Sequence, residues 1–319
     1  MAHKVNIIMY HYVRNLCQSR YPGIKGLSVS RFRQHLKALT NLGEIIVGSD
    51  IVAASKGKID LPDRAFWLTF DDGYSDHYEN VFPLLDEFGV SGTFFPPTKC
   101  LSDRFLLDVN AIHFILACTK NPTSLVARLS KILTEYASQN DLKSFDTYWT
   151  ENAHPNRFDT AEIIFVKRML QVALPSTIRR SIIDRLFLEF VSVDQAAFAE
   201  ELYMTSDQIR TMQRCGMEFG SHTDLHPWLD TMPAERQRSE IETSLKFFAS
   251  IDVCMADWTM CYPYGASTEN TQEIAKALGA VLGVTTKVGA ADLEKDDLMS
   301  LPRWDANDVE NLISKMEKF

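Results

Sequence analysis

The sequence predicts a mainly parallel α/β fold that carries an all-helical insertion. In the stretches 1–100 and 205–319, short apolar runs alternate with segments of helical periodicity, which is typical of strands connected by helices. The stretch 101–204 contains none of the 14 glycines of the chain, and its apolar residues recur at three- and four-residue spacing. We therefore assign 1–100 and 205–319 to one α/β domain and 101–204 to a helical insertion.

Eight short apolar runs predict the strands of the α/β domain. They cover 5–10, 44–47, 65–70, 92–95, 217–220, 260–262, 280–285 and 299–302. Eight strands separated by helical segments favour a (β/α) barrel over an open sheet, but periodicity alone does not decide between these two architectures.

Capping signals bound the predicted helices. A side-chain oxygen ahead of an apolar-periodic segment predicts the start of a helix, and a glycine just beyond the segment predicts its end. The predicted caps are Ser30 before 31–42, Asp76 with Glu79 before a helix that ends at Phe88, Thr205 with Gln208, and Thr268. Pattern alone predicts a helix over 233–250 and four helices in the insertion, over 111–118, 125–137, 161–174 and 177–190.

Charge and composition exclude several classes of protein. The 319 residues include 33 Lys and Arg against 42 Asp and Glu, a net charge of −9, which disfavours a nucleic-acid-binding surface. The six cysteines form no Cys-x-x-Cys pair, which argues against a zinc knuckle and a disulfide framework. We find neither a signal-peptide pattern nor the ~18 continuous apolar residues of a membrane span, so we expect no transmembrane segment and a cytoplasmic location.

Two adjacent carboxylates follow the apolar strand predicted over 65–70. In the run Leu-Thr-Phe-Asp-Asp-Gly-Tyr, Asp71 and Asp72 stand at the carboxyl end of the strand, and Gly73 permits a sharp turn. Barrel enzymes display their catalytic groups at that end of the strands. One carboxylate can bind a metal ion while its neighbour faces a substrate. Taken alone, however, an Asp-Asp-Gly turn is common.

Two histidines follow another predicted strand, at 217–220. His222 and His226 are four residues apart, the spacing that places two imidazoles on one face of a helical turn and that metal sites use. A carboxylate from elsewhere would complete a site with three protein ligands and an open position for water. Taken alone, the segment also fits a polar loop.

A third segment, Met-Cys-Tyr-Pro-Tyr-Gly at 260–265, has a constrained backbone. Pro263 fixes its own φ angle and Gly265 allows a tight turn, so the backbone N–H groups between them are held rigidly and can face a site. This segment by itself is equally consistent with a structural turn.

In this order, the three segments resemble the motifs of the polysaccharide deacetylase family (carbohydrate esterase family 4). Residues 69–73 match its Thr-Phe-Asp-Asp-Gly motif, 222–226 match its His-Ser/Thr-x-x-His motif, and 262–265 are similar to its Pro-Tyr element. The resemblance implies a distorted (β/α) barrel of about seven strands and a divalent metal ion, usually zinc. It further implies a set of roles: the metal ligands Asp72, His222 and His226, the general base Asp71, and an oxyanion donor in the backbone N–H of Tyr264.

The chain departs from this family pattern in two places. Most members have an arginine before the Pro-Tyr element, where this chain has Cys261, and a late histidine, whereas no histidine follows His226 here. A subgroup that resembles exopolysaccharide N-deacetylases takes its acid from a Tyr-His pair on the first strand and its arginine from a late strand. By that resemblance we assign His11 as the general acid and Arg303 as the residue that orients the base. A buried strand-end histidine and a surface ion pair are the alternatives for these two residues.

Other side chains near the motifs receive plainer interpretations. Tyr74, Trp228 and Trp304 flank the motifs, where they could stack on a sugar ring or pack in the core. His3 and His77 are predicted to be solvated.

The function that these motifs predict is metal-dependent removal of N-acetyl groups from a sugar or glycan intermediate in surface-polysaccharide synthesis. From the expected location we infer a nucleotide-linked sugar, a lipid-linked sugar or a short glycan as substrate. An O-acetyl esterase, a deformylase, an amidase acting on a non-sugar substrate and a non-catalytic sugar-binding homologue stay open. Because two histidines and one carboxylate also suit iron, and cobalt or nickel are not excluded, the metal stays open as well. The insertion could be a lid, an oligomer contact or a stabilising cap, and the oligomeric state is not predicted.

Overall fold

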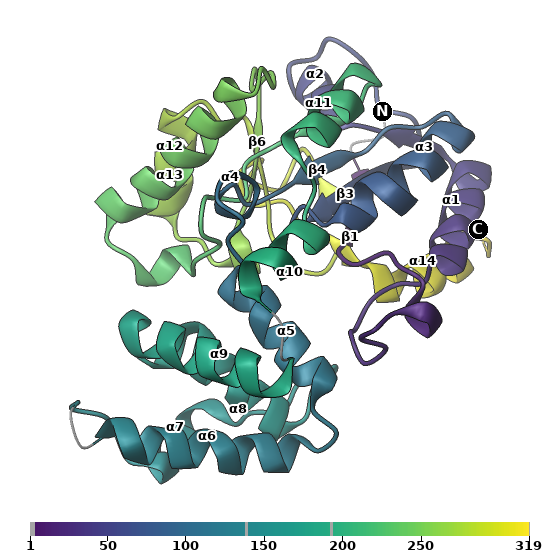
Figure 1. The fold of residues 1–319 in the computed structure, drawn as a ribbon. Coiled ribbons are helices and arrows are strands. Elements are labelled where there is room, and N and C mark those ends of the chain that lie inside the picture. Colours follow the sequence, from purple (N-terminus) through teal and green to yellow (C-terminus); the bar gives the residue numbers. More distant parts are fainter. Residues whose placement is uncertain (1–3, 138–139, 192–193, 319) are drawn as a thin grey trace. The chain divides into compact units, whose positions relative to one another are not determined.

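The computed structural model describes residues 4–137, 140–191 and 194–318, which divide into two compact units (Figure 1). The α/β unit comprises Met1–Asn15, Gly26–Phe105 and Ala199–Phe319, and the helical unit comprises Leu16–Lys25 and Leu106–Phe198. The helical unit thus includes Leu16–Lys25, which the sequence analysis assigns to the α/β domain. The boundaries of an insertion over 101–204 stay a prediction, and His3 lies outside the described residues.

Nine strands of the α/β unit form two sheets within the described residues. The strands are β1 (Lys4–Tyr10), β2 (Glu44–Ile46), β3 (Ala65–Asp71), β4 (Thr93–Phe95), β5 (Glu218–Phe219), β6 (Thr259–Cys261), β7 (Leu282–Val284), β8 (Ala291–Asp292) and β9 (Trp304–Asp305). The larger sheet has the order β5-β4-β3-β1-β8, with β2 also paired to β3 and β9 also paired to β1, and β6 pairs with β7. Every pairing is parallel except that of β8 with β1. The mixed, mainly parallel α/β fold is therefore confirmed.

The two sheets are linked by single bridges rather than by continuous ladders. Ser221 bridges to Met260 beyond β5, and Val284 bridges to Leu301 ahead of β9. Among the described residues the strands do not form one closed hydrogen-bonded barrel. The distorted barrel of about seven strands consequently stays a prediction.

The last part of the sheet differs from the predicted strands. The run at 299–302 contributes only the bridge at Leu301, and the following strand begins at Trp304. Pro302 has no N–H to donate, which interrupts a ladder at this point. Strand β8 follows a loop and pairs antiparallel, an element that apolar patterning alone does not indicate.

Eight helices lie wholly within the described part of the α/β unit. They are α1 (Val29–Leu42), α2 (Gly48–Ser55), α3 (Phe82–Phe88), α4 (Lys99–Ser102), α11 (Ser206–Arg214), α12 (Ala234–Ser250), α13 (Glu269–Ala277) and α14 (Val309–Met316). The caps predicted at Thr205 and Thr268 are confirmed, since each side chain accepts a backbone N–H of its helix. The cap predicted at Ser30 is wrong: Ser28 accepts the N–H of Arg31, and α1 begins one residue later, at Val29.

The segment after β3 is a π-helical turn, η2 (His77–Val81), that runs into α3. Pro83 lacks the N–H that would continue the α-helical ladder, and the N–H of Phe82 bonds to the oxygen of His77 five residues back. Asp76 does not cap this turn, because its carboxylate accepts hydrogen bonds from Val13 and Arg14 instead. The capping-box prediction for Asp76 and Glu79 is therefore wrong.

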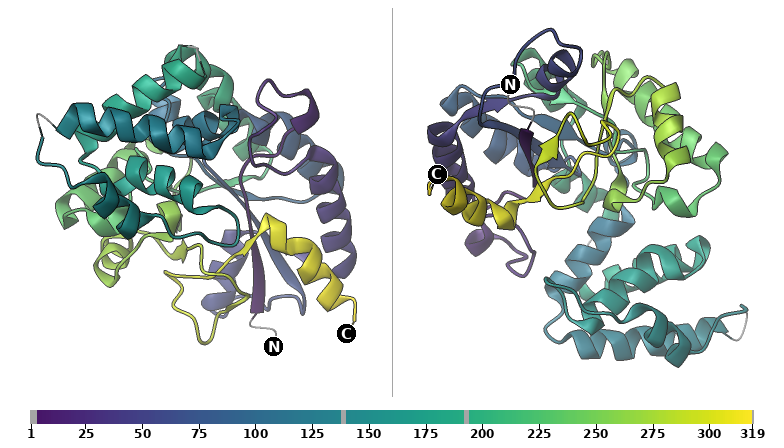
Figure 2. Two further views of the ribbon diagram at one scale, coloured as in Figure 1. Left: turned by 90° about the horizontal axis from the view of Figure 1, so that it is seen from below. Right: turned by 180° about the vertical axis from the view of Figure 1, so that it is seen from behind.

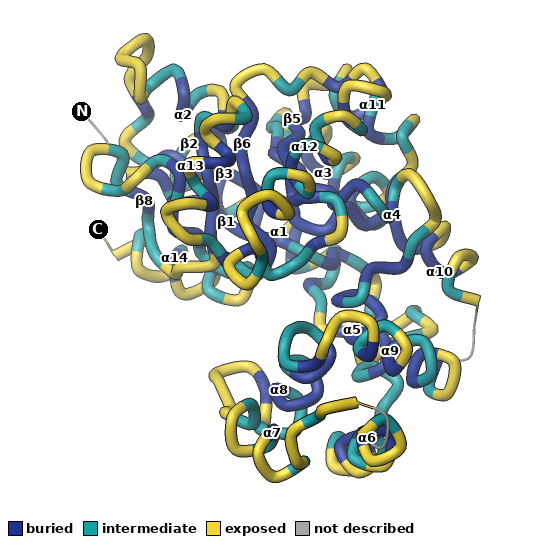
Figure 3. Tube along the Cα trace, turned by 90° about the vertical axis from the view of Figure 1, so that its left-hand side faces the viewer, coloured by how far each residue is buried: buried dark blue, intermediate teal, exposed yellow. Residues whose placement is uncertain are grey.

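The core of the α/β unit lies on both faces of β1 and β3. All seven residues of β3 are buried, which explains its near-continuous apolar sequence. Figure 3 shows β3 and most of β1 in the buried colour, and the exposed Lys4 stands at the start of β1. Helices α1 and α14 lie side by side against this sheet, as Figure 2 shows, and α12 lies beside α13. These layers place the carboxyl ends of the parallel strands together, where the motifs follow.

The helical unit has its own core. Its helices are α5 (Asp108–Cys118), α6 (Pro122–Ala137), α7 (Phe145–Asn152), α8 (Ala161–Arg168) with the π-helical continuation η3 (Met169–Ala173), and α9 (Ser176–Phe190). Helix α10 (Gln195–Leu202) spans the boundary of the two units. Within the helical unit, the buried carboxylate of Asp159 bonds to Lys25 at 2.5 Å and to Lys167 at 2.7 Å, which ties the segment before Gly26 to this unit. No helix in the described part of the chain is long and apolar enough to cross a membrane.

Candidate metal and catalytic site

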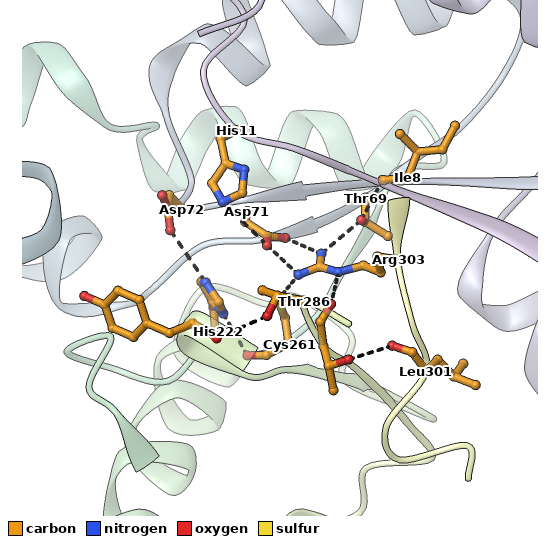
Figure 4. A network of polar contacts seen from close by, with 12 residues as sticks. Ile8, His11, Thr69, Asp71, Asp72, His222, Cys261, Thr286, Leu301 and Arg303 are labelled. Atoms are coloured by element: carbon orange, nitrogen blue, oxygen red, sulfur yellow. Dashed lines mark hydrogen bonds and ion pairs between the residues drawn. The ribbon is translucent and has the colours of Figure 1, made fainter. Parts of the chain in front are cut away.

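The paired carboxylates stand where β3 gives way to a left-handed turn. Asp71 is the last residue of the strand, and Asp72 (φ 74°) and Gly73 (φ 68°) both have positive φ. A Cβ on Gly73 would lie 2.4 Å from the side chain of Pro96, so the turn needs glycine for space as well as for its backbone angle. The abrupt change in direction sends the two adjacent carboxylates to different partners (Figure 4).

The histidine segment follows β5 and is strained. Thr223 (φ 65°) and His226 (φ 57°) adopt the left-handed conformation, which is unfavourable for residues that carry a Cβ, above all for β-branched threonine. The half-buried carboxylate of Glu240 on α12 accepts the N–H groups of Asp224 and Leu225, at 3.2 and 2.9 Å. These bonds and two from the start of α4 to the oxygens of 223 and 224 hold the strained backbone in place.

Asp72, His222 and His226 converge as a three-ligand cluster, with one ligand atom from each within 4.8 Å of the others. The Oδ1 atom of Asp72 lies 3.5 Å from the Nε2 atom of each histidine, and this buried oxygen has no hydrogen-bond partner. Tetrahedral ligands bound to zinc at about 2.0–2.2 Å lie about 3.4 Å apart, so the observed separations fit such an ion. The Nδ1 atom of His222 pairs with the oxygen of Cys261 at 2.7 Å, which aims its Nε2 atom at the cluster.

The protonation of these groups is consistent with a cation-binding site. Burial raises the pKa of Asp72, but the nearby imidazoles outweigh it and hold this pKa well below its usual range. Burial and the proximity of His222 lower the pKa of His226 to about 3, which keeps it neutral. Burial lowers the pKa of His222, but Cys261 and the two carboxylates outweigh it and raise this pKa well above its usual range. Metal binding would displace that proton, because a ligating imidazole is neutral.

Arg303 holds Asp71 through a buried bidentate pair (Figure 4). Its Nη1 and Nη2 atoms lie 2.8 and 2.7 Å from the two oxygens of Asp71, and the guanidinium also donates to Thr69 and to the oxygen of Thr285. Burial alone would raise the pKa of Asp71, but Arg303, followed by His11 and His222, lowers this pKa to about 2. Asp71 is therefore ionised and oriented, and the surface-ion-pair alternative is wrong, since Arg303 is only 1% exposed.

The position of Cys261 explains why a late arginine can serve here. Its Sγ atom lies 3.4 Å from Nη2 of Arg303, so the small side chain leaves room for the guanidinium. Cys261, Asp71 and His222 also form a second group with metal-ligand geometry. A cation bound there would meet the guanidinium that already contacts two of its three ligands, which favours the cluster around Asp72 instead.

His11 follows β1 and faces Asp71. Its Nε2 atom lies 3.9 Å from Oδ2 of Asp71, and its side chain is 39% exposed, so the imidazole lies beside the carboxylate and is open to solvent. The alternative of a buried strand-end histidine is wrong. The main-chain oxygen of His11 pairs with Nε2 of His77 at 3.0 Å.

Tyr264 is the central residue of a tight turn, η5 (Pro263–Gly265), and has φ 59°. Its ring packs edge-on against His226, with centroids 4.6 Å apart, and stacks on Trp228 at the same separation. The Pro-Tyr turn thus contacts the metal-ligand cluster. The oxyanion role of the Tyr264 N–H stays a prediction.

Two contributors were misread or missed in the sequence. Tyr74 is completely buried and donates its hydroxyl to Oδ2 of Asp72, so it is not available to stack on a sugar. His77 is also completely buried, and the prediction that it is solvated is wrong. The signal for Tyr74 was its position directly after Asp-Asp-Gly, whereas nothing local marks His77 as a partner of His11.

Comparison with known proteins places this site in a family. Residues 58–117 and 188–283 match the family model for polysaccharide deacetylase. The matched segments contain the paired carboxylates, both histidines and the Pro-Tyr turn, whereas His11 and Arg303 lie outside them. The two matched segments, which together make up slightly less than half of the chain, show a polysaccharide deacetylase domain.

Individual relatives agree with this assignment. A segment of 93 residues is 31% identical to YxkH of Bacillus subtilis (strain 168), which is classed as a polysaccharide deacetylase; it spans 29% of this chain and 33% of that relative. The fold resembles the Streptococcus pyogenes deacetylase PplD in complex with acetate, with TM-score 0.61, 20% identity and 99% of each chain covered. It also resembles IcaB from Ammonifex degensii, with TM-score 0.61, 17% identity, and 99% of this chain and 98% of IcaB covered.

Proposed function

We propose that this chain is a metal-dependent hydrolase that removes N-acetyl groups from a sugar or glycan. The observation that carries the proposal is the buried Oδ1 atom of Asp72, which has no hydrogen-bond partner and lies 3.5 Å from two imidazole nitrogens, beside a second carboxylate held by Arg303. A site for metal binding alone has no use for that second carboxylate. Zinc is the expected ion, because one carboxylate and two imidazoles form a mixed O/N ligand set that it accepts.

The mechanism follows from the positions of four groups. A divalent ion held by Asp72, His222 and His226 would polarise the scissile carbonyl and lower the pKa of the attacking water from about 15.7 towards 7. Asp71 takes the proton from that water, and Arg303 keeps Asp71 ionised and fixed in direction. A carboxylate whose pKa is about 2 is a weak base, so this proton transfer depends on the more acidic water.

Two further groups complete the proposed reaction. The Tyr264 N–H donates to the oxygen that gains negative charge, where a fixed donor is worth several kcal/mol. His11 gives a proton to the departing amine, which otherwise is too basic to leave. Water and the N-acetyl sugar thus become acetate and an amino sugar. PplD was solved in complex with acetate, which fits such a product, although that complex is a property of PplD.

The substrate that we propose is a nucleotide-linked or lipid-linked sugar, or a short glycan of surface-polysaccharide synthesis. The formal net charge of −9 disfavours a long polyanionic glycan. We also propose that the two sheets correspond to parts of the distorted barrel of the family. The cytoplasmic location stays a prediction.

Release of acetate from a panel of N-acetylated sugars tests the proposal. Asp71→Asn should abolish release while metal content stays intact, whereas His222→Ala should lose both. Near-normal rates in Asp71→Asn would contradict the assignment of the base. Formate as the released acid would indicate a deformylase, and activity restricted to O-acetyl esters would indicate an esterase.

Two other classes of function have distinct outcomes in the same experiment. Full metal occupancy with no hydrolysis across the panel would indicate a sugar-binding homologue. Iron as the sole metal found by elemental analysis would favour facial-triad chemistry, since two histidines and a carboxylate also bind ferrous iron.

A further inference from the structure

The residue that follows the Asp-Asp-Gly turn holds the carboxylate of the metal-ligand cluster. Tyr74 is completely buried and donates its hydroxyl to Oδ2 of Asp72. Its ring stacks on Tyr12, with centroids 3.9 Å apart, and lies near-parallel to Tyr203 at 6.4 Å. The donor is therefore rigid.

This bond leaves the other carboxylate oxygen for a cation. A carboxylate with two equivalent oxygens can rotate or present both of them to an ion. Here Oδ2 of Asp72 is taken by Tyr74, and Oδ1 faces His222 and His226 without a hydrogen-bond partner. Such an outer partner orients a ligand and tunes the affinity of a metal site.

The segment that continues from Tyr74 also contacts the main chain of His11, through His77. The ring of His77 is buried against Phe70, Phe94 and Tyr74, and its Nε2 atom lies 3.0 Å from the oxygen of His11. A carbonyl oxygen only accepts, so Nε2 carries the hydrogen. Burial lowers the pKa of His77 to about 4, which leaves the ring neutral in this apolar setting.

Two neighbours of His77 add bonds to the segment that follows β1. Asp76 accepts the N–H of Val13 at 3.2 Å and Nε of Arg14 at 2.8 Å. Asn80 donates to the oxygen of Val13 at 2.9 Å. Together with His77, these side chains fix the backbone on which the exposed imidazole of His11 is mounted.

We propose that the turn 74–80 is a two-sided positioning element, in which Tyr74 fixes Asp72 for metal binding and His77 fixes His11 for proton transfer. This inference rests on the proposed function, since it assigns the supports of the proposed ligand and acid. It predicts that the two residues affect different quantities: loss of the Tyr74 hydroxyl should weaken metal binding, and loss of the His77 donor should lower kcat.

The Tyr74 half is tested by metal affinity, without substrate. Tyr74→Phe keeps the stacked ring and removes the hydroxyl. We expect zinc affinity, measured by competition with a chelator, to fall about 10- to 100-fold. Tyr10→Phe is the matched control, because Tyr10 is equally buried and its hydroxyl meets His35 at 3.3 Å, away from the cluster. Its zinc affinity should equal that of the unmodified protein.

Thermal unfolding separates positioning from a merely structural role. If Tyr74 positions the ligand, zinc should raise the Tm of Tyr74→Phe by less than it raises the Tm of the unmodified protein at the same free zinc. A lower Tm for the zinc-free variant, with an unchanged gain on adding zinc and unchanged affinity, would overturn this half of the proposal.

The His77 half is tested by turnover at full metal occupancy. His77→Leu removes the donor to the oxygen of His11, and we expect kcat to fall at least about tenfold, since a placed general acid contributes 10²–10⁴-fold. His77→Gln, whose amide nitrogen can donate in place of Nε2, should recover most of kcat. Zinc affinity should be unchanged in both. Asn80→Ala removes another bond to the segment after β1 and should also lower kcat. It provides the test if His77→Leu does not fold.

The controls keep the two levels of inference apart. If His226→Ala binds zinc as tightly as the unmodified protein, the metal site and the proposed function both fail. If His226→Ala loses zinc but Tyr74→Phe does not weaken binding, only the Tyr74 assignment fails. If the unmodified protein releases no acid from the panel, the proposed function fails, and the role of His77 with it. Normal kcat in both His77→Leu and Asn80→Ala would overturn the His77 half alone.

Discussion

Loss of Arg303 from its buried pair with Asp71 should lower the free energy of unfolding of the protein substantially. Arg303→Met keeps much of the volume of the side chain and removes its charge, which leaves the carboxylate of Asp71 buried with no guanidinium to bond. Removing one partner of a buried pair costs about 3–5 kcal/mol, because the remaining charge is uncompensated. We expect a loss of that size at about pH 7 in urea unfolding of the metal-free protein.

The pH dependence of this loss follows from the pKa of Asp71, which is lowered from 3.8 to about 2 in the folded protein. A depressed pKa contributes stability that is present above the unfolded value and is lost as the pH falls through the folded value. A shift from 3.8 to about 2 corresponds to about 2.4 kcal/mol, of which about 1 kcal/mol is already lost at about pH 3. The destabilisation by Arg303→Met should therefore shrink by at least about 1 kcal/mol between neutral pH and about pH 3.

A second arginine provides the control for this experiment. Arg31 also makes a bidentate pair, with Glu310, but the two side chains are 43% and 53% exposed. Arg31→Met should cost no more than about 1 kcal/mol, because water solvates the partner left behind. Equal losses for the two variants, or a loss for Arg303→Met that is the same at both pH values, would refute the reasoning, since packing rather than charge would then explain the effect.

Three further predictions concern the backbone, a helix cap and the metal. Gly73→Ala should lower the free energy of unfolding by at least about 2 kcal/mol and weaken zinc binding, because the φ of 68° and the contact with Pro96 both oppose a Cβ; unchanged urea unfolding would contradict this. Thr205→Ala, which removes the capping box with Gln208 at the start of α11, should cost about 1 kcal/mol in urea unfolding and leave zinc affinity unchanged. Chelation should lower Tm, and Zn²⁺ but not Mg²⁺ should restore it, because Mg²⁺ prefers all-oxygen ligands; recovery with Mg²⁺ in thermal unfolding would argue against the imidazole ligands.

The convergence of Asp72, His222 and His226 could be predicted because the sequence signals for it are local. Asp72 and His222 each come two residues after the end of a predicted apolar strand, and His226 follows four residues later. These residue types and this spacing can be recognised from the sequence without knowledge of distant contacts. The carboxyl ends of parallel strands meet at one edge, which is why two motifs about 150 residues apart belong to one cluster. The pairing of Arg303 with Asp71 came from a resemblance, since no local pattern relates residues so far apart.

The supports of the segment that carries His11 could not be predicted, because their partners are distant in sequence. Asp76 fits a capping-box pattern, yet the N–H of Val13 and the guanidinium of Arg14 satisfy its carboxylate instead. His77 reads as a polar residue at the start of a helix. It is buried because its ring packs among aromatic side chains and its single donor meets the oxygen of His11. Both outcomes depend on where the end of β1 lies in space.

Backbone strain explains why this site needs so many supports. Asp72, Thr223, His226 and Tyr264 all have positive φ, and left-handed residues with a Cβ cost of order 1–3 kcal/mol each unless the surroundings over-determine them. The bonds of Glu240 to 224 and 225, of α4 to 223 and 224, and of Tyr74 to Asp72 supply that constraint. A metal ion bound to Asp72, His222 and His226, of which Asp72 and His226 lie on strained backbone, would stabilise the same conformation. Loss of a support should consequently appear first as weaker metal binding, before it appears as unfolding of the fold as a whole.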